Sequence, residues 1–159
     1  CLKAQKNNDK VFFLLVGDGT EYKKLEAYIN ETKQSNAMLM KRLPKEDYNT
    51  VVAACDVGLI FLDYRFTIPN YPSRLLSYMQ AYLPVLACTD RNTDVGKTIV
   101  SGKFGWWAES NSPADFSKRV EEALNSDLIS LGENAYEYLC RNYSVEVSHN
   151  AINGFICNS

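Results

Sequence analysis

The sequence predicts an α/β fold, a parallel sheet with helices on both faces. Short apolar segments alternate along the chain with longer amphipathic ones, which is the pattern of βαβ units. The strand candidates are continuously apolar, as expected of strands that helices cover on both sides. With 159 residues, of which 46% are hydrophobic and 23% charged, the chain can form one domain with its own core.

The first half of the chain is predicted to contain three strands and two helices. Val11–Val16 is an apolar run that ends in Gly17-Asp18-Gly19, and this is typical of a buried strand followed by a tight turn. Thr20 can cap the helix that follows. The next predicted elements are a strand at Ala37–Lys41, a helix from about Glu46 to Cys55 with Tyr48, Val51 and Val52 facing inward, and a strand at Asp56–Leu62.

A long loop, Asp63–Pro72, introduces the second half. We expect Val11–Val16, Asp56–Leu62 and Pro84–Cys88 to be the central strands, and Trp106-Trp107 to place one ring on each face of the last strand. The elements predicted after the loop are a helix from about Arg74 to Tyr82 capped by Ser73, a strand at Pro84–Cys88, a helix at Val95–Val100, a strand at Phe104–Ala108, and helices at Pro113–Asn125, Leu128–Arg141 and Val145–Ile156.

Composition and charge exclude several classes of protein. The net charge of −2 disfavours a sequence-independent nucleic-acid binder, and no apolar run approaches the ~18 residues that cross a bilayer. His149 is the only histidine, and we interpret it as structural or solvated. The odd number of cysteines, without a close pair, indicates neither a disulfide framework nor a metal site, and we expect buried reduced thiols at Cys1, Cys55, Cys88, Cys140 and Cys157.

Four loops are expected at the carboxyl ends of the strands, where ligands bind in open α/β sheets: 17–20, 41–44, 63–73 and 89–95. Gly17-Asp18-Gly19 suits a phosphate-binding turn or simply a tight connection, since Tyr22 replaces the third glycine of a dinucleotide motif. Pro72-Ser73-Arg74, before a helix, suits a diphosphate or an ordinary N-cap. The residues alone therefore support a nucleotide-binding or phosphate-binding domain without a specific chemistry.

Segments along nearly the whole chain also follow the order and spacing of one family. They are Phe13–Glu21 with Lys24-Leu25, Met40–Pro44, Ala53–Leu59, Pro72–Ala81, Leu83–Ala87, Gly102–Gly105 and Asn142–Val145. Together they resemble the C-terminal, Rossmann-like half of a GT-B glycosyltransferase of the large retaining group called group 1 or family four. The Pro-Ser-Arg-Leu version resembles the subgroup that adds amino or deoxy sugars to lipid-linked saccharides in capsule and O-antigen synthesis.

This resemblance implies a donor-binding domain for a nucleotide sugar, most often a UDP-sugar, with no cofactor and no obligatory metal. The loop at Lys41–Pro44 then holds the base, and Pro72-Ser73-Arg74 holds the diphosphate. The resemblance also implies a cytoplasmic protein, peripheral at the inner face of the membrane, whose acceptor is a lipid-linked saccharide. The expected nucleotide-sugar-binding residues are Gly17, Asp18, Gly19, Lys41, Arg42, Leu43, Tyr71, Pro72, Ser73, Arg74 and Ser77.

The chain departs from this family in two ways. Many members have two glutamates around the Pro-Ser-Arg helix, and these positions are Pro69 and Ser77 here. The N-terminal acceptor domain and the first strand of the donor domain are not among residues 1–159, so we interpret the chain, which starts at Cys1, as half of an enzyme. The alternatives are a non-catalytic or degenerate module that acts only with a partner domain, and an unrelated flavodoxin-like or response-regulator-like domain.

Overall fold

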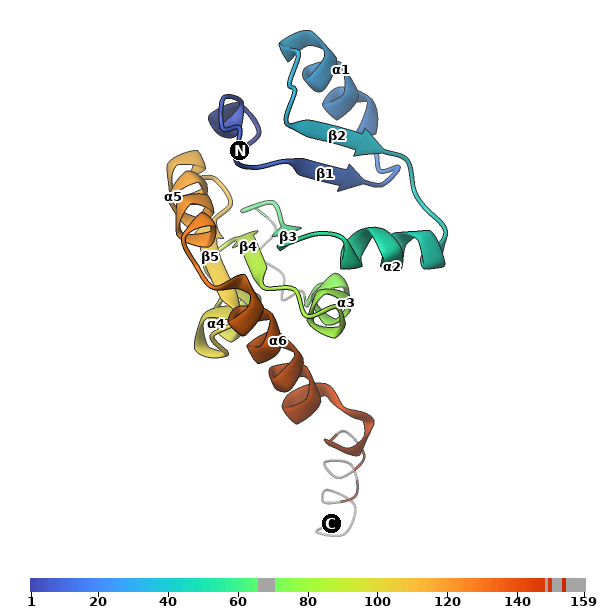
Figure 1. Ribbon diagram of the computed structural model, residues 1–159, viewed down its shortest axis with the longest axis vertical. Helices are drawn as coiled ribbons and strands as arrows, with labels where there is room; N and C mark the ends of the chain where they lie inside the picture. Colours follow the sequence, from blue (N-terminus) through green and yellow to red (C-terminus); the bar gives the residue numbers. More distant parts are fainter. Residues whose placement is uncertain (66–70, 148, 150–152, 154–159) are drawn as a thin grey trace.

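The computed structural model describes residues 1–65, 71–147, 149 and 153, and within these ranges strands and helices alternate (Figure 1). A short 3₁₀ helix, η1 (Lys3–Gln5), precedes them. In chain order the elements are β1 (Phe13–Val16), α1 (Tyr22–Thr32), β2 (Ala37–Met40), α2 (Lys45–Ala53), β3 (Gly58–Phe61), α3 (Arg74–Gln80), β4 (Val85–Thr89), α4 (Asp94–Ser101), β5 (Gly105–Glu109), α5 (Pro113–Leu124) and α6 (Leu128–Tyr143).

All strand pairs among these residues are parallel, which confirms the predicted fold class. The strands form two sheets, however, β1–β2 and β3–β4–β5, instead of the expected single sheet. Of the three strands expected to be central, only Pro84–Cys88, which corresponds to β4, has a neighbour on each side. The prediction was wrong for Val11–Val16 and Asp56–Leu62, because β1 and β3 each pair along one edge only.

Helices cover both faces of the three-stranded sheet. Alternate residues of β4 point to opposite faces, so Val85 and Ala87 join a cluster with α3, α4 and α6, whereas Leu86 and Cys88 join a cluster with α5. The two tryptophans follow the same division. Trp107 packs on the first cluster and Trp106 on the second, as predicted, and the Trp107 Nε1–H donates a hydrogen bond to Thr89 Oγ1 at 2.9 Å.

The predicted helices are present, but two of their caps differ from expectation. The N-cap of α1 is Glu21 and not Thr20, because the helix begins one residue later than expected. Ser73 does occupy the N-cap of α3, but its side chain makes no capping hydrogen bond. Helix α3 ends before Tyr82, since that residue has a φ of +56° and leaves the right-handed helical region.

The thiol environments also differ from the prediction of buried cysteines. Cys88 is buried in the sheet, Cys1 and Cys55 are half-buried, and Cys140 is exposed on α6. These four are free thiols. Cys157 lies outside the described residues, as does most of the helix expected at Val145–Ile156.

His149 is exposed, and its ring nitrogens lie 3.2 and 3.4 Å from the side-chain amide nitrogen of Asn153. Within residues 1–65 and 71–147, with 149 and 153, no three His, Cys, Asp or Glu side chains gather into a group that could hold a metal ion. Over the same residues, no helix is both long and apolar enough to cross a membrane.

Candidate functional site

A pocket of about 310 Å³ lies at the carboxyl ends of β1 and β2, where the loop rule for parallel sheets predicts a ligand. We call it the β1–β2 pocket. It brings together three of the residues expected to bind the ligand, Gly17, Arg42 and Leu43. Three other residues complete its lining, and sequence reasoning did not assign them to the site: Val16, Lys45 and Tyr48.

The lining combines an apolar surface with positive charge. Leu43 and Tyr48 are half-buried, whereas the Arg42 and Lys45 side chains are exposed at the opening. The Gly17 amide donates to the Met40 carbonyl at 3.0 Å, so the turn is held against the end of β2. No atom lies within 4 Å of the place where a Cβ of Gly17 would be. The pocket is therefore open above the Gly17 backbone and suits a flat ring that carries anionic groups.

Three further predicted residues lie next to this pocket without lining it. Asp18 and Gly19 continue the turn after β1, and Lys41 follows β2; all three are exposed. The Asp18 and Lys41 side chains and the Gly19 backbone are accessible at the same edge of the molecule. They are therefore available to a ligand larger than the pocket itself.

The other predicted residues lie at the start of α3. Pro72 is buried, Ser73 and Arg74 are exposed, and Ser77 is half-buried one turn into the helix. Tyr71 contacts the last residue of α6, Tyr143. The two hydroxyls are hydrogen-bonded, and the two ring centroids are 5.8 Å apart. Pro69 lies outside the described residues.

Tyr78 connects the start of α3 with the β1–β2 pocket. Its hydroxyl donates to the Leu59 carbonyl at 3.2 Å. Burial, and then the nearby Tyr48 hydroxyl, raise the pKa of Tyr78 to about 12, while the charge of Arg74 acts in the opposite direction. Tyr48 of the pocket and Arg74 of α3 thus both lie close enough to Tyr78 to affect its ionisation.

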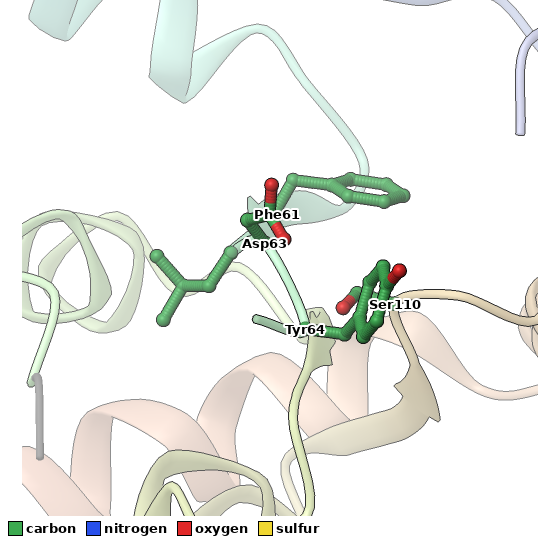
Figure 2. A pocket seen from close by; sticks show the side chains of 5 residues that line it. Phe61, Asp63, Tyr64 and Ser110 are labelled. Atoms are coloured by element: carbon green, nitrogen blue, oxygen red, sulfur yellow. The ribbon is translucent and has the colours of Figure 1, made fainter. Parts of the chain in front are cut away.

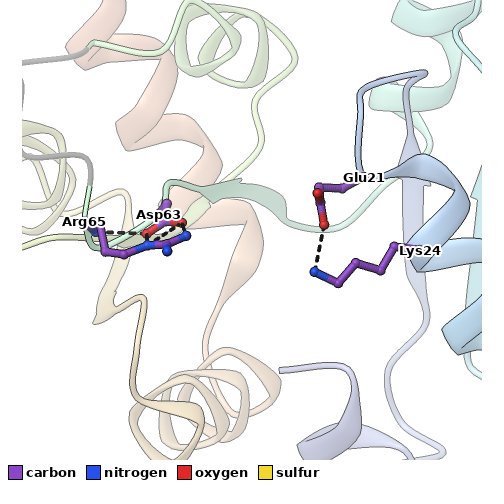
Figure 3. Close-up of polar contacts among 4 residues, drawn as sticks. All are labelled: Glu21, Lys24, Asp63 and Arg65. Carbon is purple, nitrogen blue, oxygen red and sulfur yellow. Dashed lines mark hydrogen bonds and ion pairs between the residues drawn. The ribbon is translucent and has the colours of Figure 1, made fainter.

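A second pocket, of about 300 Å³, lies at the carboxyl ends of β3 and β5, and we call it the β3–β5 pocket (Figure 2). Sequence reasoning named the loop 63–73 but assigned none of the residues that line this pocket to a binding site. Asp63 of this pocket forms an exposed ion pair with Arg65, and Figure 3 shows it together with a second exposed ion pair, Glu21–Lys24, at the start of α1. The pocket is lined by Phe61, Leu62, Asp63, Tyr64 and Ser110.

Comparison with known proteins identifies the relatives of this chain. WbjE of Pseudomonas aeruginosa, a probable glycosyltransferase, is 29% identical over 141 residues, which are 89% of this chain and 35% of WbjE. The uncharacterized glycosyltransferase MJ1178 of Methanocaldococcus jannaschii is 26% identical over 133 residues, 79% of this chain and 35% of that protein. The chain thus spans about 35% of the length of these curated relatives.

Solved structures show the same fold. A Staphylococcus aureus TarM variant, crystallised with fondaparinux, α-GlcNAc-glycerol and UDP, matches with a TM-score of 0.75 at 18% identity, over 96% of this chain and 30% of TarM. WaaG, a glycosyltransferase involved in lipopolysaccharide biosynthesis, matches with a TM-score of 0.67 at 20% identity, over 94% of this chain and 40% of WaaG. The model of the family "Glycosyl transferases group 1" matches residues 2–141, and the chain therefore belongs to that family.

Proposed function

We propose that residues 1–159 form the nucleotide-sugar-binding domain of a glycosyltransferase, with a UDP-sugar as donor. The observation that carries this proposal is the β1–β2 pocket, in which Gly17, Arg42 and Leu43 come together from two separate loops. Membership of the family and the UDP named in the TarM structure support it. We infer that the whole enzyme transfers this sugar to a growing polysaccharide or a lipid-linked saccharide.

The base occupies the pocket, where the half-buried Leu43 and Tyr48 offer apolar surface to a flat ring. The diphosphate extends toward α3, and the Arg74 guanidinium can bind two of its oxygens at once. Arg42 and Lys45 add positive charge at the opening. Because these groups can balance the charge of two phosphates, the proposed binding needs no metal and no cofactor.

The partners follow from the same proposal. The acceptor is bound by an N-terminal domain, and the acceptor itself is a lipid-linked saccharide at the inner face of the membrane, so the enzyme is cytoplasmic. Residues 1–159 alone should transfer no sugar, because the group that positions the second reactant is not among them. Sugar transfer by residues 1–159 alone, measured with a radiolabelled donor, would reject the proposal that a separate N-terminal domain binds the acceptor.

Calorimetric titration with UDP and uridine tests the phosphate contacts. We expect UDP to bind roughly tenfold more tightly than uridine, since charge-assisted hydrogen bonds are made only by the phosphates. Added salt should weaken UDP more than uridine. Arg74→Ala should reduce the difference between the two ligands, whereas Arg141→Ala, which removes an exposed arginine of α6, should leave it unchanged. Equal affinities of the unmodified chain for UDP and uridine would reject the proposal.

The position of the ribose is tested at Ser77. A carboxylate accepts charge-assisted hydrogen bonds of about 1.5–3 kcal/mol, against about 1 kcal/mol for a neutral hydroxyl. Ser77→Glu should therefore tighten UDP binding, provided that the new charge stays clear of the diphosphate, and Ser77→Gln is the uncharged control of similar size. Unchanged or weaker binding of UDP to Ser77→Glu would place the ribose elsewhere.

Ser77 also favours a second candidate, a non-catalytic or degenerate module. Its hydroxyl stands where many relatives of the family have a glutamate, so the domain could bind a nucleotide without supporting transfer. An assay with a separately supplied acceptor domain separates the two candidates. Transfer restored by that domain supports the enzyme, and tight nucleotide binding without transfer supports the module.

A further inference from the structure

Strands β1 and β3 each have one edge without a paired strand, and these two edges face each other. Figure 1 shows β2, β1, β3 and β4 in this order across the molecule, and no strand of the described residues pairs with β1 and β3 between them. The chain leads from β2 through α2 to β3, and helical crossovers of this kind join parallel strands of one sheet. The two sheets are therefore parts of one parallel arrangement that is interrupted between β1 and β3.

The backbone groups at these two edges follow from the hydrogen bonds that the strands make on their other side. The Phe13 and Gly17 N–H groups donate to carbonyls of β2 at 2.9 and 3.0 Å, and the Gly58 and Leu62 N–H groups donate to the Pro84 and Cys88 carbonyls at 2.9 Å. Successive residues of a parallel strand bond to opposite sides. The N–H groups of the residues between them therefore point away from β2 and β4, and we call these residues the β1–β3 edges: Leu14, Val16, Leu59 and Phe61.

Such edges are ready to pair with a further strand. Neither β1 nor β3 contains a proline or a charged residue, which are the usual means of blocking an edge. Among the edge carbonyls, that of Leu59 accepts the Tyr78 hydroxyl at 3.2 Å and keeps a second lone pair. A strand at an outer edge of β2 would be paired on one side only, whereas a strand between the β1–β3 edges is paired on both.

The spacing fits one intervening strand, and α5 covers one of its faces. The Phe116 ring of α5 lies 6.1 Å from the Phe13 ring and 5.7 Å from the Phe61 ring, so at most about 12 Å separates these two rings. Strands on either side of a third lie roughly 10 Å apart, because paired strands are about 4.8 Å apart. Phe61 remains 40% exposed although its ring contacts α5, and a neighbouring strand would cover this apolar surface.

Strand β4 shows which residues such a position requires. It lies between two parallel neighbours, because its Cys88 carbonyl accepts from the residue after β3 and its Val85 N–H donates to the Phe104 carbonyl before β5 at 3.0 Å. All five residues of β4 are buried and none is charged. A strand that pairs with both β1 and β3 is enclosed in the same way, so it has to be short, uncharged and mostly apolar.

We propose that the β1–β3 edges are the docking site of one apolar β-strand, parallel to both, from the part of the enzyme outside residues 1–159. The existence of that part rests on the proposed function, and the curated relatives, of whose length the chain spans about 35%, have the length to supply it. The strand joins the two sheets into one. Its carboxyl end lies between the loops after β1 and β3, so it also fixes the β1–β2 pocket relative to the second sheet.

A fusion protein tests this docking site. The probe is a segment of alternating valine and isoleucine, as long as β1, fused before Cys1 through a glycine–serine linker of about 15 residues, whose reach of roughly 20 Å exceeds the length of such a strand. The control fusion carries glycine and serine in place of the probe. We expect the amides of the β1–β3 edges to exchange at least about tenfold more slowly in the probe fusion than in the control, as measured by NMR. The Ala37 and Leu39 amides, at the outer edge of β2, should exchange equally in both.

Leu14→Pro and Leu39→Pro form a matched pair of variants. Each removes one edge N–H and leaves the hydrogen bonds between β1 and β2 in place, because the Leu14 N–H points toward β3 and the Leu39 N–H points away from β1. The probe should raise the Tm by about 3 °C or more over the control fusion in the unsubstituted chain and in Leu39→Pro. It should raise the Tm of Leu14→Pro by less than half as much. Slow exchange of the β4 amides identifies the variants that are folded, and the comparison of the two fusions requires no substitution.

Three results would overturn the inference. They are protection confined to Ala37 and Leu39, an equal rise in Tm for folded Leu14→Pro and Leu39→Pro, and slow exchange of the β1–β3 edges in the control fusion that is lost on dilution, which would mean that a second copy of the chain covers them. UDP titration of the same proteins separates this inference from the proposed function. Protection by the probe without UDP binding would reject the proposed function and keep the docking site, whereas UDP binding without protection would overturn the docking site alone.

Discussion

The β1–β2 sheet with α1 and α2, and the β3–β4–β5 sheet with α3 to α6, contain strands of similar composition but bury them very differently. All four residues of β1 are half-buried, whereas all five residues of β4 are fully buried. Helix α1 has no buried residue, while α4 buries Val95, Gly96 and Ile99. An apolar strand is therefore buried along its whole length where strands pair with both of its edges and helices cover both of its faces, whereas β3, which pairs along one edge, is buried only at Gly58 and Ile60.

Helix α5 joins the two sheets. The Phe116 ring lies 6.1 Å from the Phe13 ring of β1 and 5.7 Å from the Phe61 ring of β3, measured between centroids. In the part of the chain that the structure describes, the edges of β1 and β3 that do not pair with β2 or β4 carry no strand. The β1–β2 pocket thus belongs to the less buried sheet, which is where proteins usually place binding loops that have to adapt.

The largest expected difference concerns two phenylalanines. Phe104 is fully buried next to Tyr138, whereas Phe12 is 59% exposed beside β1. Phe104→Ala should lower the free energy of unfolding by about 3–5 kcal/mol, since it removes a core ring and leaves a cavity. Phe12→Ala should change it by less than about 0.5 kcal/mol. Urea denaturation measures both, and similar losses in the two variants would mean that the two sheets are equally buried.

Sequence reasoning predicted the elements better than their assembly. Apolar runs and helical periodicity located all five strands, because these signals are local. Whether β1 pairs with β3 depends on contacts between distant residues, and continuous apolarity cannot distinguish an edge strand from a central one when both are covered by helices.

The residues that line the two pockets could likewise be predicted only where the signal in the sequence is local. Gly17, Arg42 and Leu43 could be predicted, because each follows a strand of a parallel sheet. Lys45 was missed because it belongs to the helix after the loop, although Tyr48 was expected on the inward face of that helix. That Asp63 and Ser110 line one pocket could not be predicted, because they are 47 positions apart in the sequence and neither belongs to a motif.

The next largest difference between the two sheets is expected in the hydrogen exchange of their backbone amides. Amides of β1 and β2 should open with a free energy at least about 3 kcal/mol below that of β4, because a sheet of two half-buried strands can open without disrupting the main core. Added UDP should slow exchange in the loops after β1 and β2 more than in β4. Equal protection of β1 and β4 would show that the chain unfolds only as a whole.

The stability of the chain at alkaline pH tests the contact of Tyr78 in α3 with Tyr48 in α2. Its pKa is about 12 in the folded chain, against a value near 10 when unfolded, so folding favours the neutral phenol. The resulting stability is complete below pH 10 and is lost as the pH rises from 10 to 12, by at most about 2.7 kcal/mol. Denaturation across this range should show a smaller loss for Tyr78→Phe. The remainder comes from other groups whose pKa is raised, among them Cys88, whose pKa burial raises to about 12, and Cys55 and Tyr71, whose pKa values burial also raises. An unchanged loss in Tyr78→Phe would assign the whole effect to other groups.

The smallest expected effect compares two serines at helix N-termini. The Ser112 hydroxyl accepts the Asp115 N–H at 3.2 Å and caps α5, whereas Ser73 at the start of α3 makes no capping bond. Ser112→Ala should therefore cost about 1 kcal/mol of stability, and Ser73→Ala no more than a few tenths. If the Ser73 hydroxyl is used by a ligand instead, Ser73→Ala should weaken UDP binding while Ser112→Ala leaves it unchanged. Thermal denaturation with and without UDP measures both effects, and a stability loss at Ser73 as large as that at Ser112 would mean that Ser73 acts as an ordinary helix cap in solution.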